Sequence, residues 1–379
     1  MSSKGLSQKK DVENVKGTEF PVVGIGASAG GLEAIQELLK GLPQDTGMAF
    51  VIVPHLSAEH KSALVEILSR NTGMPVNEVA RKTTIEPNRI YIIPPNHNLS
   101  IKDGALILEQ LDTEARLPRL SIDHFLTSLA EQEKDRAIGV ILSGTGSDGT
   151  KGVQAIKAEG GITFAQSEET AKFPEMPRNA VVSGKVDYIL SPGEIAGTIV
   201  KIKPRIEYLA GAHDEYIDPS NENAFQRVIA TVRTQKDIDL SHYRRSTLNR
   251  RINRRMILRS IDKIEDYAYL LNKDAKEVEA LFQDALINVT NFYRDKEAFE
   301  ALKAKVFPNI VKDKDTSRPV RIWVPACSTG EEAYTIAMTL LEYLGDQRKD
   351  VAIQIFATDV NDQTIAKARI GVYGVNDVE

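Results

Sequence analysis

The sequence contains a single cysteine, Cys327, so no disulfide can form within the chain. A reducing, cytoplasmic compartment is the simplest interpretation of this scarcity. No apolar run approaches the roughly 20 residues that cross a bilayer. The first twenty residues contain lysines with no apolar stretch behind them, unlike a signal peptide. We therefore expect a cytoplasmic protein with no membrane insertion.

The chain has slightly fewer basic than acidic residues. It contains 48 lysines and arginines and 53 aspartates and glutamates, which gives a net charge of −5. Nucleic-acid-binding chains are more often basic, so we expect no nucleic-acid partner. The six histidines form no cluster with metal-ligand spacing, and we expect no metal site. Hydrophobic residues make up 42% of the chain, enough to build large cores and to exclude wholesale disorder.

A length of 379 residues predicts two or three domains. After a polar tail over 1–18, short apolar runs alternate with helical segments up to residue 203. The clearest runs are FPVVGIG (20–26), MAFVIVP (48–54), AIGVILSG (137–144) and GITFAQ (161–166). They are apolar throughout, as in strands covered on both faces. The fold class predicted for 19–203 is therefore α/β, with a doubly wound parallel sheet.

The periodicity then changes twice. Residues 204–222 carry prolines and charges without a clear period and predict a linker. Residues 223–290 lack strand signals and predict a small all-α domain. From residue 320 the alternation resumes with VRIWVPA, EEAYTIAMTLLEYL and VAIQIFATD, so 291–379 are predicted to start a second α/β fold.

A G-x-S-x-G motif lies between the first predicted strand and helix, with Ser28 at its centre. This is the setting of a nucleophile elbow, although glycine-rich turns there also bind phosphates. His55 follows the second strand, and Asp148 follows the strand over 137–142. The carboxyl ends of parallel strands meet at one sheet edge, where a serine, a base and an orienting carboxylate could cooperate.

Each member of this set also has a purely structural explanation. A histidine after a strand is more often a satisfied polar residue, and an aspartate before glycine is usually a turn or a helix cap. The order serine, histidine, aspartate also differs from that of ordinary α/β-hydrolases.

Four blocks in this region closely resemble the catalytic domain of chemotaxis methylesterases of the CheB type. They are VVGIGASAGGLEAIQELLKGLP, FVIVPHLSAEH, GVILSGTGSDGTKGVQAIKAEGG and FAQSEETAKFPEMPRNAV. The resemblance implies hydrolysis of glutamate methyl esters on chemoreceptors, and deamidation of certain glutamines, with no cofactor. It implies that Ser28 is the nucleophile, His55 the general base and Asp148 the orienting carboxylate. Ala29 and Thr145 depart from the family, which often has threonine and methionine there.

Seven arginines fall between residues 244 and 259 and predict a strongly positive helix face. The positive charges of such a face repel one another unless negative groups neutralise them, so we expect an acidic partner. A solvated face and nucleic acid are the alternatives, although no interleaved aromatics support the latter.

A strand, a small-residue turn and a helix start follow one another in RIWVPACSTGEE (321–332), and Asp359 ends the next strand. An acidic residue there typically accepts ribose hydroxyls, but packing alone also explains the pattern. Cys327 is expected to be a packing residue.

The blocks RINRRMILRSIDKIEDYAYLL, LINVTNFYRDKEAFEAL, RIWVPACSTGEEAYTIAM and FATDVNDQTIAKARIGVYG resemble the start of the CheR-type receptor methyltransferases. The resemblance implies S-adenosylmethionine as cofactor, contacted by Asn288, Thr290, Arg294, Glu332 and Asp359. It implies that the arginine helix docks an acidic receptor helix, through Arg250, Arg251, Arg254 and Arg255. Ala326 stands where the family often has glycine. With two strands predicted, we expect roughly 100 or more residues of a class I methyltransferase fold to be missing.

We therefore expect a protein-glutamate methylesterase fused to an incomplete glutamate methyltransferase, with a methyl-accepting chemoreceptor or a related signalling protein as partner. A catalytically silent protein that docks acidic receptor helices is one alternative. A generic acyl hydrolase is another.

Overall fold

The structure is a computed structural model that describes residues 17–54, 64–110, 120–210, 219–286, 290–312, 314, 317–345 and 351–374. It consists of two compact units, one up to Leu281 and one from Phe282. Most of the expected N-terminal tail lies outside the described residues. Thr18, its last residue, is anchored, because its N–H and hydroxyl donate to the Glu133 carboxylate at 2.9 and 2.7 Å.

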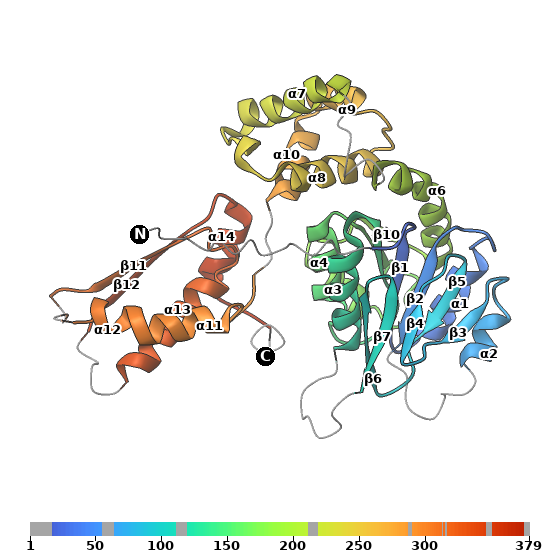
Figure 1. Ribbon diagram of the computed structural model, residues 1–379, viewed down its shortest axis with the longest axis horizontal. Coiled ribbons are helices and arrows are strands. Elements are labelled where there is room, and N and C mark those ends of the chain that lie inside the picture. The colour runs from blue at the N-terminus through green and yellow to red at the C-terminus, as the bar shows by residue number, and fades with distance from the viewer. Residues whose placement is uncertain are drawn as a thin grey trace, which may run out of the picture. The chain divides into compact units, whose positions relative to one another are not determined.

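Seven parallel strands form the main sheet of the first unit, in the order β10-β9-β8-β1-β2-β5-β3 (Figure 1). This confirms the predicted doubly wound parallel sheet. Strands β2, β3 and β5 lie on one side of β1 and the later strands β8, β9 and β10 on the other, so the strand order reverses between β1 and β8. The strands are β1 (Val22–Ala27), β2 (Ala49–Pro54), β3 (Val76–Glu78), β5 (Arg89–Ile92), β8 (Ala137–Ile141), β9 (Ile162–Gln166) and β10 (Tyr188–Leu190).

Glycines in β1 explain how closely the helices pack on one face of this sheet. A Cβ at Gly24 would lie 2.5 Å from Leu126, and one at Gly26 would lie 2.4 Å from Ile122, both on α3. The missing side chains therefore let α3 lie directly on β1. The helices around the sheet are α1 (Gly31–Lys40), α2 (Leu64–Ser69), α3 (Ser121–Glu133), α4 (Thr150–Glu159), α5 (Glu175–Val182) and α6 (Pro192–Ala210).

A second, antiparallel sheet was not expected from the sequence. It consists of β4 (Lys82–Thr84), β6 (His97–Lys102) and β7 (Ala105–Gln110), in the order β4-β7-β6. Leu99, Ile101 and Leu106 of this sheet join the core formed by α3 and the parallel strands.

The region predicted to be a linker, 204–222, begins as helix. Helix α6 runs on to Ala210, with Pro204 inside it. Ile202, Ile206 and Leu209 are buried on one face of this helix. Their burial stabilises the helix by more than it loses through the hydrogen bond that proline removes. The helices that follow are α7 (Pro219–Lys236), α8 (Arg245–Leu258), α9 (Ile264–Leu271) and α10 (Ala275–Ala285), with a short 3-10 turn over Leu240–His242.

The second unit contains a two-stranded parallel sheet among its described residues, β11 (Val320–Pro325) and β12 (Ile353–Thr358). One face is covered, whereas Trp323 and Phe356, paired across the strands, are 68% and 54% exposed on the other. The helices are α11 (Lys296–Ala301), α12 (Phe307–Ile310), α13 (Glu331–Leu344) and α14 (Asp362–Ile370), and a π-helical segment over Leu302–Val306 joins α11 to α12.

Across the part of the chain that the structure describes, no helix is both long enough and apolar enough to cross a membrane.

Candidate functional site

Ser28 lies in the turn between β1 and α1, at the carboxyl edge of the sheet. Its N–H donates to the Ser143 carbonyl at 2.9 Å, and its own carbonyl accepts the N–H of Gly31 at 2.8 Å. Gly30 has a φ of 68°, a conformation that favours glycine and lets the turn enter the helix sharply. Because Ser143 follows β8, the two loops on either side of the strand-order reversal are held together here.

Ser143 joins three loops at this edge, although it was not among the residues expected to form the site. Its buried hydroxyl donates to the Ala29 carbonyl at 2.9 Å and accepts the N–H of Phe173 at 3.0 Å. Its own N–H donates to the Gln166 side chain at 2.8 Å. Four polar contacts therefore fix the turn that carries Ser28 relative to the loops after β8 and β9. A serine that directly follows a buried strand was the available signal.

The backbone beside Ser28 leaves no room for a larger residue. A Cβ at Gly144 would lie 2.8 Å from the Ser28 Cβ and 2.7 Å from Met176. The next residue in the loop, Thr145, is exposed. The loop after β8 thus combines one residue in tight contact with the serine and another that faces solvent, which suits a loop that contacts a substrate.

Asp148 is buried at the end of the same loop, with 4% of its surface exposed. Its two carboxylate oxygens accept the N–H groups of Ile122 and Asp123, at 3.0 and 2.8 Å, at the start of α3. His55 lies outside the described residues, so the structure brings together Ser28 and the loop of Asp148 but does not place the histidine. The roles assigned to the three residues stay predictions.

The four arginines of the predicted docking face on α8 contact carbonyl and carboxylate groups of this chain. Arg251 donates to the carbonyls of Lys157, at 2.9 Å, and Ala158 at the C-terminal end of α4. A cation at this end of a helix satisfies free carbonyls and favours the helix dipole. Gly160, with a φ of 99°, allows the close approach, because a Cβ there would lie 3.1 Å from Arg250.

Arg254 makes the most deeply buried contact of α8. It donates to the Gly161 carbonyl at 3.1 Å and pairs with Asp187. Burial alone would raise the pKa of Asp187, but the charges of Arg254 and Lys157 and the N–H of Thr163 lower this pKa below its ordinary value. The carboxylate is therefore held ionised in the interior of the unit.

The remaining two arginines of the predicted docking face are also paired. Arg250 lies 3.3 Å from Glu159, and Arg255 forms two 2.8 Å hydrogen bonds with the buried Glu277. Arg251 and Arg254 are each 1% exposed. The expectation of a face open to an acidic partner is therefore wrong for these two residues, because both are buried against carbonyl groups and Asp187 of the esterase domain.

The loop after β11 brings part of the expected cofactor site together in the second unit. Asp359 accepts the N–H groups of Ser328 and Asn361 at 2.7 and 2.8 Å. The Ser328 hydroxyl is buried and has no hydrogen-bond partner among the described residues. Ala326, Ser328 and Gly330 all have positive φ angles, of 54°, 49° and 101°. Such a strained turn is typical of a loop shaped for a ligand.

Two of the other residues expected to contact the cofactor are exposed. Glu332 is exposed in the first turn of α13, and Arg294 is exposed as well. The segment that contains Thr290 is tied to α13, because the N–H of Tyr293 donates to Thr335 at 3.4 Å. Asn288 lies outside the described residues.

Aromatic side chains also connect the segment around Thr290 to the loop after β11. Phe292 packs edge to face on Tyr373 with ring centres 4.9 Å apart, and the Tyr373 hydroxyl donates to the Thr329 carbonyl at 2.7 Å. Cys327 is 1% exposed in this core, and burial, together with the charge of Asp359, raises the pKa of its thiol. A buried, protonated thiol is a packing group rather than a nucleophile.

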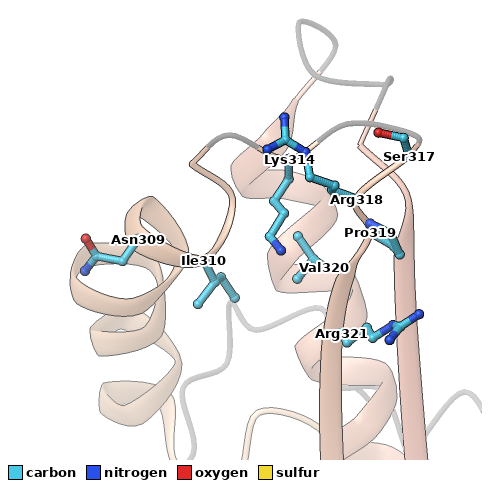
Figure 2. A pocket seen from close by; sticks show the side chains of 8 residues that line it. All are labelled: Asn309, Ile310, Lys314, Ser317, Arg318, Pro319, Val320 and Arg321. Carbon is cyan, nitrogen blue, oxygen red and sulfur yellow. The ribbon is translucent and has the colours of Figure 1, made fainter.

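A pocket of about 540 Å³ lies elsewhere in this unit (Figure 2). Lys314, Arg318 and Arg321 line it at the start of β11. The loop of Ser328 follows the opposite end of that strand, so the pocket is separate from the residues expected to contact the cofactor. No group of three or more acidic, histidine or cysteine side chains in the described ranges is arranged to hold a metal ion.

Three family models match consecutive parts of the chain. They are the CheB methylesterase over residues 23–199, the CheR methyltransferase all-alpha domain over 223–286 and the CheR methyltransferase SAM binding domain over 288–379. The solved Thermotoga maritima CheB methylesterase catalytic domain is similar to 48% of this chain and matches over 98% of its own length, with 28% identity and a TM-score of 0.45.

Among curated relatives, an uncharacterized 104.1 kDa protein of Rhodobacter capsulatus is 32% identical over 82% of this chain, and the match spans 34% of that protein. A putative protein-glutamate methylesterase/protein-glutamine glutaminase of Leptospira interrogans is 33% identical over 48% of this chain and 95% of its own length. A Geobacter sulfurreducens protein named protein-glutamate methylesterase/protein-glutamine glutaminase 3 is 36% identical, over 48% of this chain and 49% of its own. The chain belongs to the CheB methylesterase family, and CheR-type all-α and SAM-binding regions follow the methylesterase domain in the same chain.

Proposed function

We propose that the first domain hydrolyses methyl esters of glutamate side chains with Ser28 as the nucleophile. The Ser28 oxygen attacks the ester carbonyl while His55 takes the serine proton and passes it to the departing methoxide, which leaves as methanol. Water, activated by the same histidine, then hydrolyses the glutamyl–Ser28 ester and releases the free glutamate side chain. With a glutamine side chain the same steps release ammonia, which is a deamidation.

The observation that carries this proposal is the hydrogen bond from the Ser28 N–H to the Ser143 carbonyl, 2.9 Å long, across the strand-order reversal. It holds the serine turn against the loop that ends at Asp148. Open α/β sheets place ligands at this point. The start of α1 directly follows the turn, and a helix N-terminus favours the negative charge that develops on the carbonyl oxygen during attack.

The second unit is proposed to bind S-adenosylmethionine, which would supply a methyl group for the reverse modification. Asp359 would accept the ribose hydroxyls, and the buried Ser328 hydroxyl beside it has polar capacity left for a ligand. Thr290, Arg294 and Glu332 belong to the same proposal, as does Asn288. The residues present thus fit a nucleoside-containing cofactor on the side of Asp359.

The substrate proposed for both regions is a methyl-accepting chemoreceptor or a related cytoplasmic signalling protein. An exposed arginine face on α8 was the reason to expect docking of an acidic receptor helix. Arg251 and Arg254 are buried, so that reason no longer holds. Recognition by α8 would need another face of that helix, so we propose no separate docking function.

The substrate class can be tested with two esters. The full chain should release methanol from a methyl-esterified chemoreceptor fragment with a much higher kcat/KM than that for hydrolysis of p-nitrophenyl acetate. Equal preference over a broad ester panel would indicate a generic acyl hydrolase instead. Binding of the fragment without turnover of either ester would favour the silent docking protein. Ser167→Ala is a suitable control, because Ser167 lies at the same sheet edge but bonds to Thr170.

A further inference from the structure

Helices α3 and α4 start side by side, and each is capped by a carboxylate that belongs to the start of the other. The helices' own N-cap residues provide no side-chain hydrogen bond. Asp148, two residues before the first residue of α4, accepts the N–H of Asp123 in the first turn of α3 at 2.8 Å. Asp123 in turn accepts the N–H of Gly152 in the first turn of α4 at 2.7 Å. The two aspartates thus form a reciprocal cap, a closed ring of contacts between the two helix starts.

Both carboxyl groups of the reciprocal cap are buried, Asp123 at 7% and Asp148 at 4% exposure. Two carboxylates in one buried site repel each other when both are ionised. Burial, followed by the charge of Asp148, raises the pKa of Asp123 to about 7, against the opposing effects of the Gly152 N–H, the Lys151 charge and the Gly149 N–H. Near neutral pH Asp123 therefore changes between its neutral and its ionised form.

We propose that Asp123 is a positioning residue of the esterase, which fixes the Asp148 carboxylate through the reciprocal cap. This inference rests on the proposed function, in which Asp148 orients His55. An aspartate in a loop can rotate about two side-chain bonds, and the N–H groups of α3 hold this carboxylate in one orientation. The Asp123 carboxylate holds the start of α4, and so the backbone of Asp148, against α3.

The reciprocal cap also predicts an effect of charge on the catalytic base. When Asp123 ionises, a negative charge appears in the reciprocal cap and favours the protonated, inactive form of His55. A neutral side chain at position 123 removes that charge. The acid limb of the pH profile of kcat/KM should therefore move to lower pH in Asp123→Asn, which keeps an oxygen to accept the Gly152 N–H.

The experiment uses the full chain with p-nitrophenyl acetate as the probe, so it does not depend on the identity of the natural substrate. In Asp123→Ala, which removes the acceptor, we expect kcat to fall about 10-fold or more with little change in KM. In Asp123→Asn we expect most of kcat to return on the alkaline plateau, with the acid limb displaced to lower pH.

The matched control is Glu133→Gln. Glu133 is another buried carboxylate on α3, at the far end of the helix, where it binds Thr18. Its substitution should lower stability without moving kcat or the pH profile. The positioning role is overturned if Asp123→Ala loses stability as Glu133→Gln does but keeps the wild-type kcat and pH profile.

Ser28→Ala separates failure of this inference from failure of the proposed function. Hydrolysis of p-nitrophenyl acetate that persists in Ser28→Ala would overturn the serine mechanism and the positioning role together. Activity on p-nitrophenyl acetate that depends on Ser28, with no methanol released from the receptor ester, would overturn the substrate class alone. The comparison of the Asp123 variants would still decide the positioning role in that case.

Discussion

Arg254 on α8 and Asp187, which directly precedes β10, form an ion pair in which the arginine side chain is fully buried and the aspartate side chain is 3% exposed. Asp187 also accepts the N–H and hydroxyl of Thr163, both at 3.0 Å, so its charge is well satisfied. This pair joins the all-α region to the esterase domain and explains why both belong to one compact unit.

Replacement of one partner of this pair should be severe. Arg254→Ala leaves the Asp187 carboxylate buried and without its main counter-charge, so we expect the free energy of unfolding to fall by about 3–5 kcal/mol in urea titrations. Arg70→Ala is the control, because Arg70 pairs with Glu66 on the surface with side chains 73% and 69% exposed. That pair should contribute less than about 1 kcal/mol. Equal losses of stability in the two variants would contradict a larger stabilising effect of the buried Arg254–Asp187 pair.

Stability should depend on pH through Asp123. Its pKa is about 7 in the fold against an ordinary value of 3.8, so the folded state binds more protons than the unfolded state between these values. The stabilisation that this group contributes is fully present below about pH 4. It is lost as the pH rises from about 4 through 7, by up to about 4 kcal/mol in the free energy of unfolding. Urea titrations of the wild type and Asp123→Asn should therefore diverge from pH 4 to pH 8, with the variant relatively more stable at high pH. Parallel curves would contradict the raised pKa.

Gly144→Ala should impair catalysis more than folding. The added methyl group would lie 2.8 Å from the Ser28 Cβ and must displace the serine or its neighbour. Displacement of a reacting group by about 1 Å lowers kcat by about 10²-fold, which steady-state hydrolysis of p-nitrophenyl acetate would detect. Gly197→Ala on α6, where no atom lies within 4 Å of the new Cβ, is the control and should keep full activity. A fully active Gly144→Ala would show that the loop yields without moving Ser28.

Ala326→Gly should stabilise the second unit. Ala326 has a φ of 54°, a region that costs a residue with a Cβ about 1–2 kcal/mol. The greater freedom of glycine in the unfolded chain offsets about 0.4–1 kcal/mol of that gain. We expect a net increase of about 0.5–1 kcal/mol in the free energy of unfolding. Ala298→Gly, at an exposed position of helix α11, should instead destabilise the unit by up to about 1 kcal/mol. Destabilisation by both substitutions would contradict the strain at Ala326.

The parallel sheet was predictable because its strands are buried on both faces. Runs such as FPVVGIG and AIGVILSG are apolar at nearly every position, a signal that needs no knowledge of neighbours. Strand β6 was missed because its residues alternate weakly between buried and partly exposed, and its identity depends on pairing with β7. The helical end of α6 was missed because Pro204 and the nearby charges masked the spacing of its buried isoleucines.

The placement of Ser28 and Asp148 at the carboxyl ends of strands was predictable from the sequence, whereas their catalytic roles stay predictions. The site was not predictable where contacts join residues far apart in the sequence. Ser143 acts on Phe173 thirty residues away, and Asp123 caps a helix that starts after Asp148. The arginines of α8 were expected to face outward because their local sequence offers no anion, whereas Asp187 lies 67 residues before Arg254.

The decisive measurement for the serine mechanism is the rate of methanol release from a methyl-esterified chemoreceptor fragment by the wild type and by Ser28→Ala. Matching circular dichroism spectra would show that both proteins are folded. We expect release by the wild type and, in the variant, a loss of several orders of magnitude, because no other group replaces the attacking oxygen. Release at the wild-type rate by Ser28→Ala would contradict the serine mechanism.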